Sequence, residues 1–245
     1  LAVFEEDLAI SLAVLETYWR HTGGIDELDV EETCRRLFDD SMLVDLDLAE
    51  RSVRLHDTVR AWLLVRTGKD LPVLHDRLLA SYDGGGNAWH RVPDDGYLYA
   101  HLAQHLAEAR RLEELKHLLL DLDWMRVRLS GGGTRVPGHI RPEVAGLIDD
   151  YRWLSREPET TLVARALRMS AHVIAKWPDQ LAAQLYGRLG NEASPGIRGL
   201  CRAAIAACRG TPLAPRRAAL RPPGALVQTL AGHEDSVNGA ALLPD

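Results

Sequence analysis

The tripeptide Leu55-His56-Asp57 holds the side chain best placed for chemistry. It lies in the stretch SVRLHDTVRAWLL, where a short β-ribbon is predicted to end and a helix to begin with Asp57 as its N-cap. A helix N-terminus carries partial positive charge and free N–H groups, which favour anions. An imidazole at that position can donate a hydrogen bond to a phosphate oxygen. The sequence thus predicts an anion contact through His56, although it contains no phosphate-binding loop. The alternative is structural: His56 packs against the ribbon or caps the helix.

A second candidate is the pair His101 and His105, one helical turn apart in HLAQH with Glu108 nearby. Two histidines at this spacing can hold zinc. The zincin pattern requires a Glu directly after the first His, and Leu102 occupies that position. We therefore predict a core or inter-helix role for these side chains and no metal site.

No arrangement of residues predicts catalysis. Acidic residues around a ribbon turn and a helix end could suggest paired carboxylates, but solvated charge is usual in such places. They are Asp39, Asp40, Asp45, Asp47 and Glu50. The stretch SGGGTRVPG lacks the Gly-Lys-Ser/Thr ending of a P-loop and is predicted to be a connector. No G-x-S-x-G elbow occurs, and none of Cys34, Cys201 and Cys208 stands in a nucleophile motif.

The composition indicates a packed, soluble chain. It has 245 residues, of which 46% are hydrophobic and 26% charged, and no apolar run is long enough to span a membrane. Three cysteines argue against a disulfide framework, so we expect a reducing, cytoplasmic setting. The first residue is not Met, so we expect the chain to begin inside a longer protein. An excess of Arg over Lys indicates a GC-rich, bacterial genome.

Charge is unevenly distributed along the chain. The net charge is −6, yet residues 1–70 hold 16 acidic and 8 basic residues, a net charge of −8. Residues 193–231 contain six Arg and no acid. Opposite charge at the two ends indicates contact between parts of the chain or with a partner.

The first 70 residues are predicted to form a winged helix. Helical periodicity spans residues 10–20 and 27–39, followed by a two-stranded ribbon in MLVDLDL and SVRLH and a helix over 58–66. This order of helix, helix, ribbon and helix is typical of the winged-helix fold. The second helix is predicted to bury five residues, namely Leu28, Val30, Cys34, Leu37 and Phe38.

The rest of the chain is predicted to be mainly α, with a multi-helix array over residues 71–215. Pro158, Pro178 and Pro195 mark helix starts, and the six tryptophans are predicted to be packing anchors. Residues 216–224, rich in Pro, Arg and Ala, are predicted to be a linker, with Arg216, Arg217 and Arg221 as its basic side chains. Residues 225–245 alternate like strand, turn and strand, the opening of a WD-repeat propeller.

Several segments, in this order, carry a family resemblance. LFDDSMLVDLD and SVRLHDTVRAWL look like a winged-helix ending, and YLYAHLAQHLAEARRLEELKHLLLDLDWMRVRL, with Leu122-Asp123-Trp124, looks like the start of a helical domain. Gly232-His233, Val237 and Leu243-Pro244-Asp245 look like the first propeller strands. Together they resemble the apoptotic protease-activating factor-like signal-transduction ATPases of the NB-ARC, or STAND, class.

The resemblance implies a parent protein with a P-loop module before residue 1 that binds ADP or ATP with magnesium. In that family ADP holds the closed state, and the winged-helix His contacts its phosphate; here this role falls to His56 alone. The implied partners are the P-loop module, the propeller that acts as sensor, and further copies of the protein on activation. This chain itself is expected to bind no cofactor, to have no ATPase activity and to hold its winged-helix and helical parts rigidly together.

Two alternatives remain at this point. A helical scaffold that binds a protein partner would need no nucleotide. A winged-helix transcription regulator is the weaker alternative, because the predicted reading helix carries five acids against Arg35 and Arg36 and would repel phosphates.

Overall fold

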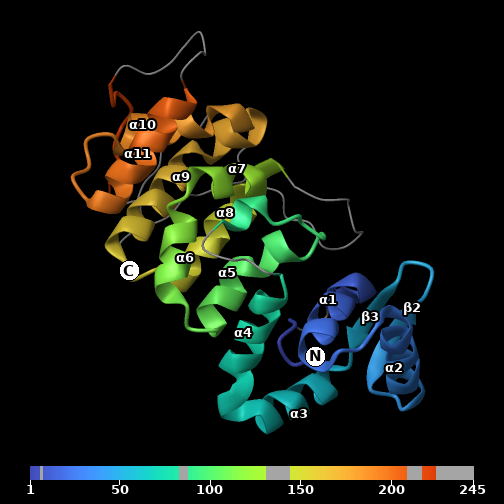
Figure 1. Cartoon of the computed structure of the whole chain (residues 1–245). Coiled ribbons are helices and arrows are strands. Elements are labelled where there is room, and N and C mark those ends of the chain that lie inside the picture. Colours follow the sequence, from blue (N-terminus) through green and yellow to red (C-terminus); the bar gives the residue numbers. More distant parts are fainter. Residues whose placement is uncertain (6–7, 83–87, 131–143, 209–216, 225–245) are drawn as a thin grey trace, which may run out of the picture.

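The computed structural model of this chain describes residues 1–5, 8–82, 88–130, 144–208 and 217–224. The predicted propeller strands of residues 225–245, Arg216 and nearly all of the glycine-rich connector lie outside the described residues. The chain is mainly α-helical with one small antiparallel sheet, which confirms the predicted fold class (Figure 1). Within the described ranges, no helix has the length and apolar character needed to cross a membrane.

Residues 1–67, which we call the N-terminal unit, combine three strands with three helices. In chain order these are β1 (Ala9–Ser11), α1 (Leu12–Gly23), α2 (Glu27–Asp39), β2 (Leu43–Asp47), β3 (Ser52–Leu55) and α3 (Asp57–Thr67). The strand order in the sheet is β1-β3-β2, and both pairings are antiparallel. Val53 in the central strand pairs with Ile10 on one side and with Leu46 on the other.

The start of α1 differs from the prediction. Helical periodicity placed Ile10 in the first helix, but residues 9–11 form β1, an edge strand of the sheet that the sequence did not predict. The side chain of Ser11 accepts a hydrogen bond from the Ala13 N–H at 3.2 Å, and the helix begins at the next residue, Leu12. The Ser11 cap is therefore the physical reason for the boundary.

Helix α2 buries less than was predicted. Val30 and Cys34 are fully buried, but Leu28 is 80% and Phe38 43% exposed, so their predicted burial is wrong. Val30 and Cys34 lie one turn apart and form a narrow buried stripe, and Leu28 points away from it. Phe38 follows Cys34 by one turn but lies in the last turn of α2, at the exposed end of the helix.

Residues 68–224, the helical unit, continue with short 3₁₀ turns and further helices. The helices are α4 (Leu71–Ser81), α5 (Leu98–Glu108), α6 (Leu112–Leu119), α7 (Leu122–Ser130), α8 (Val144–Asp150), α9 (Pro158–Lys176), α10 (Leu181–Leu189) and α11 (Pro195–Ala207), with 3₁₀ turns at Gly68–Asp70, Trp89–Arg91, Tyr151–Leu154 and Pro178–Gln180. Pro158 and Pro195 begin α9 and α11, and Pro178 begins a 3₁₀ turn, as predicted.

The prediction that all tryptophans anchor packing is wrong for two of them. Trp89 and Trp124 are fully buried, but Trp62 and Trp177 are 58% and 50% exposed.

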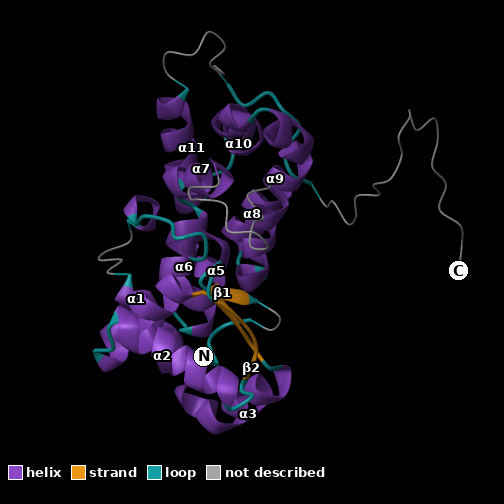
Figure 2. Cartoon of the chain, turned by 90° about the vertical axis from the view of Figure 1, so that its right-hand side faces the viewer, coloured by secondary structure: helices purple, strands orange, loops and turns teal. Residues whose placement is uncertain are grey.

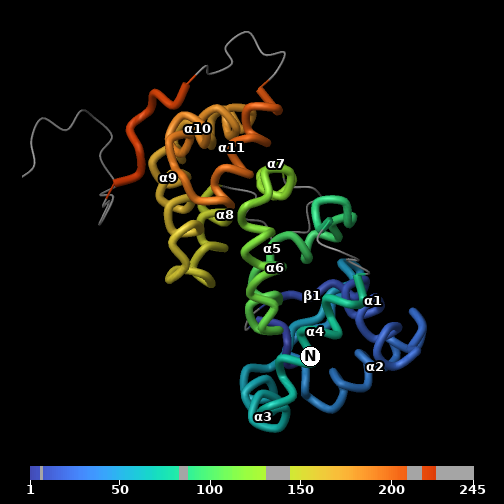
Figure 3. The backbone as a smooth tube through the Cα atoms, turned by 60° about the vertical axis from the view of Figure 1, so that its left-hand side comes forward, coloured from blue at the N-terminus to red at the C-terminus, as the bar shows by residue number. Residues whose placement is uncertain are grey.

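Two hydrophobic cores meet at α4. Leu78 belongs to the core of the N-terminal unit, and its neighbour Leu79 belongs to the core of the helical unit. The hydroxyl of Tyr18 on α1 also donates to the Leu74 carbonyl at 3.2 Å. Figures 1 and 3 show α4 between the N-terminal helices and α5, with α10 and α11 at the far end of the molecule. Figure 2 shows the strands beside α3 at the N-terminal end.

Candidate functional site

His56 begins helix α3 as its N-cap. Its backbone is extended, with φ −70° and ψ 134°, and its Nδ1 accepts the Thr58 N–H at 3.3 Å and lies 2.8 Å from the Thr58 hydroxyl. The sequence predicted Asp57 as the cap, which is wrong, because Asp57 is the first residue inside the helix. The cap is set by the sheet: β3 ends at Leu55, and the His56 N–H donates to the Met42 carbonyl at 3.3 Å.

This use of Nδ1 defines what His56 can offer a ligand. A neutral imidazole that accepts through Nδ1 carries its proton on Nε2. The side chain is exposed, and no described residue forms a hydrogen bond with Nε2. His56 therefore presents a single N–H donor to solvent at the positive end of α3, an arrangement suited to an anionic oxygen.

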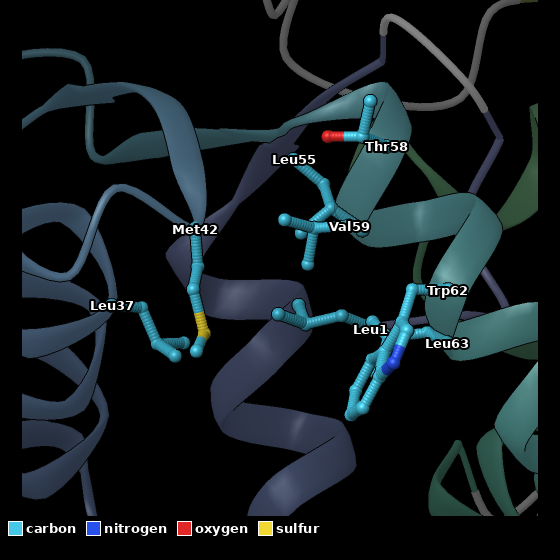
Figure 4. A pocket seen from close by; sticks show the side chains of 8 residues that line it. All are labelled: Leu1, Leu37, Met42, Leu55, Thr58, Val59, Trp62 and Leu63. Carbon is cyan, nitrogen blue, oxygen red and sulfur yellow. The ribbon is translucent and has the colours of Figure 1, made fainter.

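An apolar pocket of about 310 Å³ lies beside this cap. Figure 4 shows Leu37 and Met42 on one side of it and Val59, Trp62 and Leu63 of α3 on the other. Leu1, Leu55 and Thr58 complete the lining. Thr58 joins the pocket to the cap, since the same residue bonds to His56.

Helix α3 makes this pocket unusual for the surface of a folded chain. It carries Val59, Trp62 and Leu63 toward the pocket, yet none of its residues is fully buried. Trp62 is 58% exposed, and the Arg66 guanidinium lies over its ring at 5.4 Å from the centroid. The pocket thus offers an apolar hollow beside the cap, open to an apolar side chain from another surface.

His101 and His105, for which the sequence predicted a core or inter-helix role, lie where the two hydrophobic cores meet. His105 is buried, and its Nε2 lies 2.7 Å from the Tyr97 hydroxyl while its Nδ1 lies 2.7 Å from Nδ1 of His75. His101 stacks on the Tyr97 ring and lies 3.7 Å from the Glu5 carboxylate. Among the described side chains, no group of three or more His, Cys, Asp or Glu could hold a metal ion.

The acidic residues considered for catalysis do not converge on the pocket. Asp39 and Asp40 lie exposed at the end of α2, and Glu50 is exposed in the turn between β2 and β3. Asp45 lies 3.7 Å from Arg54, and the Asp47 carboxylate accepts two turn N–H groups. These contacts are those of surface ion pairs and turns.

The three cysteines are buried, with free thiols. Burial, with the nearby Glu31 carboxylate as a smaller cause, raises the pKa of Cys34 to about 11. Burial likewise raises the pKa of Cys201 to about 11, helped by Glu192. A thiol with a raised pKa is a poor nucleophile.

Comparison with known sequences identifies the first part of the helical unit. Residues 71–136 match the APAF-1 helical domain. Apoptotic protease-activating factor 1 of Danio rerio is 27% identical over 158 residues, which cover 62% of this chain and 11% of that protein. The Homo sapiens protein of the same name is 24% identical over 186 residues, covering 73% of this chain and 14% of that protein.

The match supports an Apaf-1-like helical region in a regulatory part of a signalling protein. It covers α4 to α7, including the Leu122-Asp123-Trp124 segment singled out from the sequence. In the structure Trp124 of this segment is fully buried and packs edge-on against Tyr99, with ring centroids 5.1 Å apart. The segment thus serves the core of the helical unit.

Sequence reasoning missed the pocket beside His56. One signal was present: Val59, Trp62 and Leu63 follow helical spacing directly after the cap, but Trp62 was predicted to be a packing anchor and no surface was assigned to the other two. Leu37 and Met42 come from another part of the chain, and no local pattern places them opposite α3. The pocket could therefore be recognised only from the folded structure.

Proposed function

We propose that this chain is the regulatory region of an Apaf-1-like STAND ATPase, in which the N-terminal unit acts as a winged helix. His56 donates its Nε2–H to a phosphate oxygen of ADP held by a P-loop module elsewhere in the parent protein. The helical unit couples this contact to a WD-repeat sensor that follows it. ADP and magnesium belong to the parent, and the chain described above supplies the histidine.

The observation that carries the proposal is the combined use of the His56 ring. Nδ1 caps α3, which fixes the ring against the helix, and Nε2 remains exposed as a donor. A contact that forms only when the module is docked gives ADP a higher affinity for the closed state, which a switch requires. The order of strands and helices in the N-terminal unit and the match of residues 71–136 support the same assignment.

The apolar pocket supports a docked module as the second half of the contact. It lies within one residue of the cap, and of its apolar lining from α3 Trp62 is exposed while Val59 and Leu63 are half-buried. Burying Trp62 and its neighbours against another domain would hold that domain next to Nε2. The nucleotide contact and the protein contact would then form together.

Release of ADP from the full-length protein tests the proposal. His56→Ser keeps a side-chain oxygen that can cap α3 but removes the Nε2 donor. We expect ADP to leave about ten to a hundred times faster, the range for losing one hydrogen bond to a charged group. His172→Ala, which changes an exposed histidine one turn before the end of α9, is the matched control and should leave the rate unchanged. An unchanged ADP off-rate in His56→Ser would refute the sensor role.

A nucleotide-independent protein-binding scaffold is the second candidate, favoured by the exposed apolar pocket. It predicts that Trp62→Ser weakens a partner's binding equally with ADP, with ATP and without nucleotide. The switch predicts a nucleotide-dependent loss. The transcription-regulator alternative gains no support, because Arg35 and Arg36 on α2 are engaged by Glu31 and Glu32.

A further inference from the structure

Residues 217–224, predicted to be a linker, lie along helix α10. The Leu220 N–H donates to the Gly187 carbonyl at 3.0 Å. Pro223 is buried and Ala218 is half-buried. Figure 3 shows this segment running beside α9 and α10. The chain is therefore attached to the helical unit well after α11 ends.

Gly187 makes room for this segment. A Cβ atom at Gly187 would lie 2.8 Å from Cγ and Cδ1 of Leu220, and these are its two nearest neighbours. A Cβ at Gly190, one turn later, would lie 3.0 Å from Cβ of Ala218, but it would be closer still to the carbonyl oxygen and ring of Tyr186, at 2.8 and 2.9 Å. Glycine in the interior of a helix is unfavourable by about 1 kcal/mol relative to alanine. Its presence at Gly187 is explained by the close approach of Leu220.

Arg188 ties the segment to two helices at once. Its Nη1 donates to the Arg221 carbonyl at 2.9 Å. Its Nε donates to the buried hydroxyl of Ser170 on α9 at 2.7 Å, and its Nη2 donates to the Met169 carbonyl at 3.3 Å. The guanidinium thus donates two hydrogen bonds to α9 and one to the segment.

The contact is specific but small. Leu220 remains 39% exposed, and Arg217, Ala219 and Arg221 are exposed. In the described ranges, Leu220 to Gly187 is the one main-chain hydrogen bond between the segment and α10. The core of the helical unit uses none of residues 217–224, so the segment can separate while the helices stay packed.

We propose that residues 217–224 are a releasable clip, docked against Gly187 and Arg188 of α10, that fixes where the chain leaves the helical unit. When docked, Gly224 is held at α10. When released, this constraint on the position of Gly224 is lost. The clip itself follows from the contacts above; its use in signalling rests on the proposed function, because it would transmit the sensor's position to the helical unit.

Hydrogen–deuterium exchange of the full-length protein tests the clip. In the wild type, the amide of Leu220 should exchange slowly because it is bonded to Gly187. Gly187→Ala should evict Leu220 and make this amide exchange about tenfold faster or more, while α10 itself is not weakened. Gly199→Ala is the matched control, since it makes the same change in α11 at a position with no neighbour within 4 Å. It should leave the exchange of Leu220 unchanged.

A second substitution tests whether the clash is the cause. Cβ of Leu220 lies 3.4 Å from the Cβ position at Gly187, which is ordinary contact. The double variant Gly187→Ala, Leu220→Ala should therefore regain slow exchange at residue 220. The proposal is overturned if the wild-type amide exchanges as fast as an unfolded peptide, if Gly187→Ala changes nothing, or if the double variant does not recover.

This outcome is separate from that of the proposed function. Fast exchange at Leu220 together with rapid ADP loss in His56→Ser would refute the clip and support the nucleotide switch. Slow, Gly187-dependent exchange with an unchanged ADP off-rate would support the clip and refute the switch.

Discussion

His75 on α4 and His105 on α5 face one another with their Nδ1 atoms 2.7 Å apart, where the core of the N-terminal unit meets that of the helical unit. Only one of two facing Nδ1 atoms can carry the proton in such a bond. If His105 accepts from the Tyr97 hydroxyl through Nε2, its proton is on Nδ1 and is donated to His75. The joint is thus held by two neutral imidazoles.

Acid is expected to weaken this joint. Burial lowers the pKa of His75 to about 4, with nearby Arg60 as a smaller cause, and burial lowers that of His105 well below its ordinary value, with His75 and His101 contributing. The unfolded chain takes up these protons near pH 6.5, but the folded chain does not. The contribution of these two histidines to the free energy of unfolding is therefore fully present above about pH 6.5, and it decreases as the pH is lowered toward about 4.

Urea unfolding between pH 7.5 and 4.5 measures this effect. Each suppressed protonation contributes up to about 3 kcal/mol at the acid end of the range. The groups that face the pair are Arg60, Tyr97, His101 and Glu5, and Glu5 lies 3.7 Å from His101. The double variant His75→Phe, His105→Leu should flatten the pH dependence even if its stability at pH 7.5 is lower. An equally steep dependence in this variant would contradict the assignment.

Removing the cap at His56 should destabilise the N-terminal unit modestly. His56→Ala deletes the Nδ1 acceptor of the Thr58 N–H, and loss of an N-cap costs about 1 kcal/mol. His56→Ser supplies a hydroxyl acceptor and should stay within about 0.5 kcal/mol of the wild type. Chemical unfolding of the three proteins separates this structural role from nucleotide contact. Equal destabilisation by Ala and Ser would show that the cap bond is not what His56 contributes.

The cap also shows where sequence reasoning reaches its limit. The sequence placed His56 correctly at the junction of ribbon and helix, because alternation ends and helical spacing begins there. It chose Asp57 as the cap, because Asp is a strong N-cap residue. The observed cap depends on pairing: Leu55 opposite Leu43 ends β3, and the His56 N–H bonds to Met42. The pairing of β3 with β2, and not the intrinsic N-cap preference of Asp57, sets the first residue of the helix.

The other departures have the same origin. Strand β1 forms because Ile10 pairs with Val53, far along the chain, and no local pattern distinguishes it from the start of α1. The pocket joins Leu37 and Met42 to α3, and residues 217–224 dock on α10 through Arg188. Contacts of this kind between distant segments were not predictable without the fold.

A buried ion pair in the helical unit should be sensitive to loss of one partner. Arg128 on α7 and Asp150 at the end of α8 are 5% and 8% exposed, with Nε and Oδ2 3.1 Å apart. Asp150→Ala leaves the guanidinium without this carboxylate and should cost about 3 to 5 kcal/mol. Asp149→Ala removes the adjacent, exposed acid that pairs with Arg152 and should cost less than about 1 kcal/mol. Thermal unfolding compares the two variants, and similar losses would argue against a buried pair.

Trp62 should matter for binding and little for stability. It is 58% exposed over the pocket, whereas Trp124 is fully buried. We expect Trp62→Ala to change the free energy of unfolding by less than about 1 kcal/mol, and Trp124→Ala to cost about 3 to 5 kcal/mol. Binding of the dye ANS, which detects exposed apolar surface, should fall in Trp62→Ala but not in Trp177→Ala, a tryptophan equally exposed but outside the pocket. If the Trp62 variant unfolded as readily as the Trp124 variant, the ring would have to be part of the core, and the pocket could not be an open surface for a docked domain.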